Sequence, residues 1–135
     1  MWQENVEIVR RLSALLERRD WRGMTDLLDP NVEFTWDCRG AWRKARSLRG
    51  ISQISQAFET EGDEVWDEHR IEPQEFIDAG DRVVVLQREF QRSKSGVETV
   101  IDTAGIVDLR DGRVVRMHGY MNPAEALEAA GLSDG

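Results

Sequence analysis

Acid–base chemistry is best placed on one strand-like run, residues 83–90. Gln87 and Glu89 lie two residues apart there, and residues two apart on a β-strand share a face. A carboxylate against apolar side chains can act as a general acid or base, and an amide can orient the polar end of a substrate. Periodicity does not decide whether this face or that of Arg88 and Phe90 is interior, because both faces begin apolar and end polar.

Three further side chains could take part in chemistry, but each has a simpler interpretation. His118, beside Tyr120, could be a general base, although a histidine on the outer face of a sheet is more often an interface or surface group. His69 lies among charges before a strand, so we expect it to be solvated. Alternation places Asp37 opposite Trp36, which favours a surface carboxylate.

The two histidines and the single cysteine give no set of metal ligands. The histidines fall on different elements, and neither an HxxxH spacing nor a carboxylate pair accompanies them. Cys38 is alone, which excludes an internal disulfide and a multi-cysteine metal site. We therefore expect no metal and no cofactor.

The composition is that of one globular domain, which we expect to span residues 1–135. The net charge of −8 would repel nucleic acid and anionic membranes, so we expect neither as a partner. The basic cluster between Arg39 and Arg49 is interpreted as a solvated loop. No run approaches the roughly 18 apolar residues of a membrane span, and the first residues lack the features of a signal peptide. These observations predict a cytoplasmic protein.

Three long β-branched runs in the C-terminal half, residues 83–90, 97–109 and 113–121, should position the candidate carboxylate. Turn signals at 93–96 and 111–112 separate them, which predicts three antiparallel strands joined by hairpins. On the last strand, alternation places four side chains toward the interior: Val115, Met117, Gly119 and Met121. The opposite side carries Arg116, His118 and Tyr120.

The remaining segments should cover this sheet. Apolar residues at spacings of three and four over residues 2–16 predict an amphipathic helix, and Asp20 is the expected N-cap of a short second helix. Period-two alternation begins a strand at Val32, and residues 38–49 are interpreted as a loop. Gly50 opens another helix, and residues 74–78 should form an edge strand because Pro73 precedes them. Residues 122–125 predict a capped final helix.

Several motifs resemble the nuclear-transport-factor-2-like superfamily, specifically its SnoaL-like polyketide-cyclase branch. They are Arg19-Asp20-Trp21, Leu27-Leu28-Asp29-Pro30-Asn31-Val32-Glu33, Leu48-Arg49-Gly50-Ile51, the stretches 76–85 and 109–115, and the terminal stretch 124–131. They are specific for the fold and nearly silent about chemistry. The resemblance implies an α+β cone-shaped barrel, with a strongly curved, mainly antiparallel sheet wrapped around N-terminal helices and an apolar pocket at its wide end.

Catalytic positions of enzymes in this superfamily can be compared one at a time. Where a ketosteroid isomerase has its proton-moving groups, the alignment puts residues that cannot move a proton: Leu12, Phe34 and Gly105. Where a limonene epoxide hydrolase has an aspartate on the last strand, this chain has Gly119. The arginine and aspartate of that enzyme fall on Gln87 and Glu89. The resemblance thus turns Glu89 inward, where desolvation would raise its pKa, while a register slip or bulge would leave it on the surface.

The resulting hypothesis is an apolar pocket with Glu89 as its functional carboxylate. Its expected lining is Phe34, Trp36, Trp42, Phe58, Gln87, Val107, Met117 and Met121, although such aromatic and methionine stripes are also typical of plain core. Three functions remain open: a cofactor-independent hydrolase, isomerase or cyclase; a non-catalytic protein that binds a small hydrophobic ligand; and a dimerisation module with a filled core. An apolar outer sheet face predicts a homodimer through Val100, Ile106, His118 and Tyr120.

Overall fold

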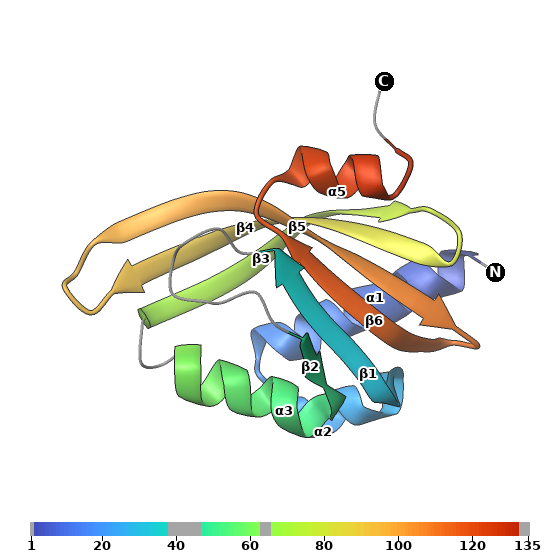
Figure 1. The fold of residues 1–135 in the computed structure, drawn as a ribbon, viewed down its shortest axis with the longest axis horizontal. Coiled ribbons are helices and arrows are strands. Elements are labelled where there is room, and N and C mark those ends of the chain that lie inside the picture. Colours follow the sequence, from blue (N-terminus) through green and yellow to red (C-terminus); the bar gives the residue numbers. More distant parts are fainter. Residues whose placement is uncertain (1, 38–46, 63–65, 133–135) are drawn as a thin grey trace.

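A six-stranded sheet with helices on both of its faces forms the domain (Figure 1). The computed structural model describes residues 2–37, 47–62 and 66–132. The strand order is β2-β1-β6-β5-β4-β3, and all neighbours are antiparallel except β1 and β6, which run parallel. The sheet is curved but stays open between its edge strands. The predicted α+β class with N-terminal helices against a curved, mainly antiparallel sheet is confirmed.

Apart from the short strand β2, the elements follow the predicted order. The strands are β1 (Leu28–Asp37), β2 (Ser47–Arg49), β3 (Trp66–Asp78), β4 (Arg82–Ser93), β5 (Glu98–Arg110) and β6 (Arg113–Tyr120). The helices are α1 (Trp2–Glu17), α2 (Trp21–Met24), α3 (Gly50–Gln56) and α5 (Pro123–Ala129). A short 3-10 helix (Thr25–Leu27) precedes β1, and a π-helix (Ala57–Gly62) follows α3. In the part of the chain described, no helix is long and apolar enough to cross a membrane.

The three C-terminal strands are the best-predicted part of the chain. Two hairpins join β4, β5 and β6, as the turn signals indicated. The second turn has positive φ at both central residues, 53° at Asp111 and 78° at Gly112, the backbone that a tight two-residue hairpin needs. The β4–β5 hairpin extends beyond the helices at the left of Figure 1.

A β-bulge on β6 makes the predicted facing of Val115 wrong. Leu109 pairs with Val114, whereas Asp108 pairs with Arg116, so β6 holds one extra residue at this point. Such an insertion shifts the alternation of the strand by one residue. Val114 is therefore fully buried in the core and Val115 is only partly buried.

Three strand boundaries also differ from the prediction. β1 begins at Leu28 instead of Val32, with a register shift between Leu28 and Glu33. β3 begins at Trp66 instead of Gln74, with shifts between 66 and 68 and between 73 and 75. Residues 47–49, expected within a loop, form the edge strand β2; the rest of that expected loop lies outside the described residues. Irregular pairing hides strands from a strict period of two.

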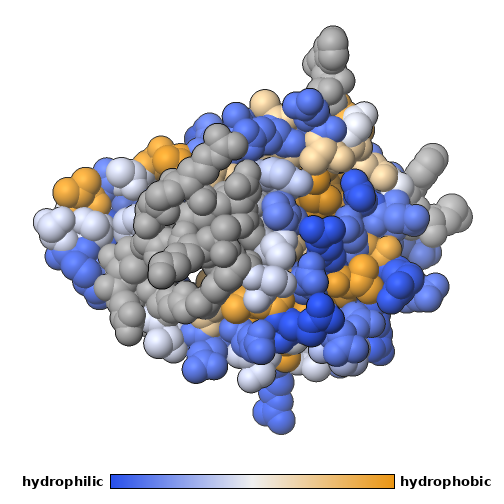
Figure 2. Space-filling model, viewed as in Figure 1, coloured by the Kyte–Doolittle hydropathy of each residue, from blue (hydrophilic) through white to orange (hydrophobic). Residues whose placement is uncertain are grey.

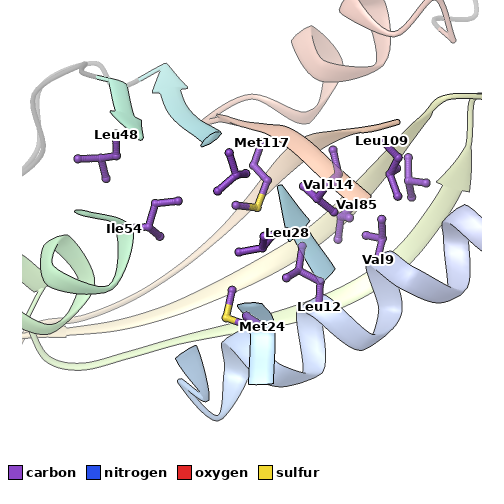
Figure 3. Packing of buried hydrophobic residues seen from close by; sticks show 13 residues of the cluster. Val9, Leu12, Met24, Leu28, Leu48, Ile54, Val85, Leu109, Val114 and Met117 are labelled. Atoms are coloured by element: carbon purple, nitrogen blue, oxygen red, sulfur yellow. The ribbon is translucent and has the colours of Figure 1, made fainter. Parts of the chain in front are cut away.

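The main core lies between α1 and the inner face of the sheet. Val9 and Leu12 of the predicted helix stripe are 1% and 3% exposed, and they point from α1 toward Val85 and Val114 (Figure 3). Burial of such a side chain contributes about 1.5–3 kcal/mol. Asp20 caps α2 as expected, because its Oδ1 accepts a hydrogen bond from the Gly23 amide at 2.9 Å. These contacts fix α1 and α2 over one face of the sheet.

The opposite face is covered in part by the C-terminal helix of the same chain. Ala126 of α5 packs with Val84, Ala104 and Ile106. Asn122 caps this helix, as predicted, by accepting from the Ala124 amide at 3.0 Å. The expectation that Ile106 is exposed for a partner is therefore wrong, because α5 already supplies the apolar contact.

Candidate functional site

A cavity of about 200 Å³ lies between α1, the π-helix and the inner face of the sheet. Its wall is mainly apolar, with residues from α1, β1, the π-helix and β3 to β6, and most of its polar residues lie on β4 and β5. The residues that carry the argument below are Phe34, Phe58, Gln87, Glu89, Ile101 and Thr103. A mostly apolar cavity with a few convergent polar groups is the usual form of a small-molecule site.

The cavity owes part of its space to two glycines that face each other across neighbouring strands. Gly105 of β5 pairs with Gly119 of β6, and both line the cavity. A Cβ atom added at Gly105 would meet only the His118 carbonyl oxygen, at 3.7 Å. At these two positions, where the alignment puts catalytic acids of related enzymes, this chain thus has no side chain, and at Gly105 there is room for a Cβ atom.

Glu89 lies on the inner face of β4 and contributes to the cavity wall. Thr103 Oγ1 donates a hydrogen bond to Glu89 Oε2 at 2.6 Å, and Gln87 Nε2 donates to Thr103 Oγ1 at 3.2 Å. Arg88 points to the other face, where its Nε lies 2.9 Å from Asp102 Oδ1, and this hydrogen bond raises the pKa of Arg88. The alternative register, with Arg88 and Phe90 facing inward, does not occur.

His69 is the second member of the carboxylate site, and the expectation that it is solvated is wrong. Its Nε2 lies 2.7 Å from Glu89 Oε1, and the two side chains are 4% and 15% exposed. His69 is inside β3 and not before it, two residues from Ile71, which pairs directly with Glu89. The inner face of β3 therefore carries His69 to the carboxylate.

A signal for this position was present in the sequence. Glu68, Arg70 and Glu72 alternate with His69 and Ile71, a period of two that is typical of a strand with one wet face. The charged set occupies the outer side in the structure, as the exposure of Glu68 and Arg70 indicates. Because Pro73 indicates a strand that begins at Gln74, the prediction leaves the alternation on its N-terminal side out of that strand, although both belong to β3. The prediction that this strand lies at an edge of the sheet is confirmed.

The aromatic wall is held by contacts between elements distant in sequence. The Phe58 ring lies 5.5 Å from the Trp21 ring and 6.0 Å from the Phe34 ring, centroid to centroid. Trp21 Nε1 also donates to Glu59 Oε1 at 2.9 Å. Because Phe58 and Glu59 are neighbours in the π-helix, Trp21 anchors this segment beside the cavity.

His118 and Tyr120 lie on the outer face of β6, as alternation predicted, because they pair with Ile106 and Ala104. Both residues also border the cavity. The His118 ring lies 4.6 Å from the Tyr120 ring, and its Nδ1 is hydrogen-bonded to Thr35 Oγ1. Tyr120 also packs against the cluster beneath α5. The predicted facing of these two side chains is confirmed, and their contact with a second copy stays a prediction.

The cavity brings together seven of the sequence-predicted pocket residues. They are Phe34, Phe58, Gln87, Glu89, Val107, Met117 and Met121. Trp36 belongs to β1, but its side chain, like that of Asp37, is outside the described part of the chain, and so are Trp42 and Cys38. Among the side chains that are described, no group of three His, Cys, Asp or Glu could hold a metal ion.

Solved structures with the same fold include proteins that carry small molecules. TerC, crystallised with polyporic acid, is 26% identical, with 95% of this chain and 98% of that chain covered and a TM-score of 0.78. A putative SnoaL-like polyketide cyclase from Jannaschia sp. CCS1 is 21% identical, with 100% and 96% covered and a TM-score of 0.70.

A hypothetical protein with a ketosteroid-isomerase-like fold from Catenulispora acidiphila DSM 44928, in complex with trimethylamine, is 18% identical, with 93% of each chain covered and a TM-score of 0.69. At these identities the Jannaschia and Catenulispora proteins show the fold alone. No curated protein matches the chain. The family model of the SnoaL-like domain matches residues 9–117, a span that includes the second half of α1, the carboxylate site and most of the sheet. The chain therefore belongs to the family of SnoaL-like domains.

Proposed function

We propose that this domain binds a small, largely apolar molecule in the cavity and exchanges a proton with it through Glu89. The reaction would be a cofactor-independent one of the hydrolase, isomerase or cyclase kind. One observation carries the proposal: the Glu89 carboxylate forms part of an apolar cavity wall and is held there by His69 and Thr103. A positioned carboxylate beside a bound molecule is the minimum requirement for general acid–base catalysis.

The size of the cavity limits the ligand. An engineered apolar cavity of about 150 Å³ takes up benzene, and pockets for drug-sized molecules begin at about 300 Å³. The cavity here, at about 200 Å³, fits a molecule of one or two rings. TerC, co-crystallised with polyporic acid, supports the use of this fold for binding a small molecule.

Gln87 would orient the polar end of the ligand. Its amide nitrogen is engaged by Thr103 Oγ1, so its carbonyl oxygen is the atom that can accept a hydrogen bond from a bound molecule. Gln87 and Glu89 lie on the same face of β4 and both line the cavity. A ligand with one polar edge and an apolar body would match this arrangement.

A proton-exchange assay tests the proposal without knowledge of the natural ligand. The probe is β-tetralone, a two-ring ketone with weakly acidic C–H bonds, in heavy water. We expect the protein to accelerate the loss of its exchangeable proton NMR signals above the buffer rate. Glu89→Gln, which keeps the shape and removes the charge, should return exchange to the buffer rate while binding of the ketone persists.

The two outcomes that contradict the proposal differ. If β-tetralone binds but exchange stays at the buffer rate, the non-catalytic binding function becomes the better one, and Gly105 and Gly119 at the positions of catalytic acids favour it. If the ketone neither binds nor exchanges, the cavity is not a site for ligands of this class.

We also propose that two copies associate through the part of the outer sheet face that α5 leaves open. Val97, just before β5, and Val100, near the start of β5, are 60% and 56% exposed. Figure 2 shows small, separate apolar areas at the left end of the molecule, where the β4–β5 hairpin lies. Exposed apolar side chains gathered on a sheet support an interaction surface.

A further inference from the structure

The hydrogen bonds around Glu89 have a direction that can be followed from one strand to the next. The Gln87 amide nitrogen donates to Thr103 Oγ1, so the hydroxyl hydrogen of Thr103 is directed to Glu89 Oε2. Glu89 Oε2 is therefore an acceptor. With Glu89 as an ionised carboxylate, the 2.7 Å contact between Oε1 and His69 Nε2 requires a hydrogen on Nε2, because a carboxylate has none to give.

Burial assigns different roles to the two acid–base side chains. Glu89 is 15% exposed and lines the cavity, whereas His69 is 4% exposed and is not among the described residues of the cavity wall. The carboxylate can touch a bound molecule, and the imidazole reaches it only through Glu89. His69 thus stands in the position of a residue that orients a catalytic group.

We propose that His69 is a positioning residue that holds Glu89 ionised and aims it into the cavity, which makes Glu89 a base. This inference rests on the proposed function and deepens it. Hydrogen bonds donated to a carboxylate favour its charged form, and donors from β3 and β5 on its two oxygens restrict its rotation.

The consequence is a definite class of ligand. Because the site starts without a proton to give, the bound molecule must supply it from a weakly acidic C–H or O–H bond. The proton moves to a Glu89 oxygen, the electron pair of the broken bond stays on the ligand, and His69 keeps its Nε2 hydrogen throughout. A neutral proton donor is therefore favoured over an anion, which would meet a carboxylate of its own sign.

The first test measures the state of His69 without any ligand. The chain has two histidines, so a nitrogen NMR spectrum of the imidazoles contains two sets of signals, and His118→Gln identifies which belongs to His69. We expect a hydrogen on Nε2 and a clear shift of that nitrogen in Glu89→Gln. A His69 ring with its hydrogen on Nδ1 and a bare Nε2 would overturn the proposal, because Glu89 would then be the donor.

The second test separates positioning from folding. His69→Phe removes the donor, whereas His69→Gln places an amide N–H near the site of Nε2. We expect His69→Phe to slow β-tetralone exchange by about ten- to a hundredfold, the cost of a misplaced catalytic group, with the dissociation constant unchanged. His69→Gln should restore most of the rate.

Equal rates in wild type and His69→Phe would contradict the positioning role. If wild type itself shows no exchange, the proposed function fails, and the NMR spectrum still decides whether His69 holds Glu89 ionised. The two failures can thus be told apart.

Discussion

Gly105 of β5 lies directly opposite Gly119 of β6, and neither residue has a side chain to fill the interior. In a curved sheet the inner face is crowded, so a pair of glycines at one level leaves a gap that packing cannot close without movement of the backbone. Part of the cavity therefore exists because the sequence has glycine at both of these paired positions. Its volume can be changed at these positions without replacing a member of the carboxylate network.

Gly105→Leu should abolish ligand binding. The new Cβ would meet only the His118 carbonyl oxygen at 3.7 Å, so the side chain can enter the cavity and occupy the space of one ring. We expect the dissociation constant of β-tetralone, measured by isothermal titration calorimetry, to rise at least about tenfold, which corresponds to about 1.4 kcal/mol. Gly105→Ala is the matched control and should change it by less than about threefold. Unchanged binding in the leucine variant would place the ligand elsewhere.

Thr103→Val should destabilise the fold. Thr103 is 2% exposed, and its hydroxyl joins Gln87 to Glu89, so the substitution leaves buried polar groups with one partner fewer at a cost of about 1–3 kcal/mol. Urea unfolding measures this loss. The control is Thr99→Val on the same face of β5, whose exposed hydroxyl donates to Gln91; we expect less than about 0.5 kcal/mol there. Equal costs at the two positions would refute a buried network.

Asn122→Ala should loosen α5. The Asn122 side chain accepts the hydrogen bond of the Ala124 amide, and loss of such a cap costs about 1 kcal/mol. Because α5 covers Ala104 and Ile106, hydrogen exchange should accelerate in β5 as well as in the helix. Glu128→Ala, an exposed change in the same helix, serves as the control. Faster exchange in α5 alone would mean that the helix contributes nothing to the sheet.

Val100→Asp should weaken the proposed dimer. A charge at the centre of an apolar contact loses its water shell without gaining a partner. We expect wild type to sediment as a dimer at a concentration of tens of micromolar and the variant as a monomer. Ser95→Asp, in the exposed turn of the same hairpin, should leave the assembly intact. A monomeric wild type under these conditions would remove the proposal.

The predictable parts of the fold are those in which a regular period meets a clear end signal. β4, β5 and β6 show long β-branched runs between glycine turns, and both Asp20 and Asn122 cap the helices that their positions suggested. β-Bulges and other irregular pairing made the remaining strands harder to predict. One extra residue at Val115 changed which side chains of β6 are buried, and irregular pairing near Pro73 concealed the first half of β3.

The hydrogen-bond partners of Glu89 could not be predicted from the sequence of β4 alone, because they lie on β3 and β5. The sequence argument considered only desolvation, which disfavours the charged form of a carboxylate. The structure adds two hydrogen-bond partners of the carboxylate, Thr103 from β5 and His69 from β3. In the proposal above both of them donate to Glu89, and donated hydrogen bonds favour its charged form. Thr103 and His69 reach Glu89 only because β3, β4 and β5 pair in one particular register. No local sequence pattern specifies that register.

Pro73 also affects whether other chains can add a strand to this edge of the sheet in concentrated solution. It lies in β3, an edge strand, and a proline there has no N–H to offer to an incoming strand. Its register shift interrupts the row of backbone groups that a second chain would need as a template. Growth of fibres by strand addition is thus obstructed along this edge, and the long, charged β3 can remain exposed without promoting aggregation.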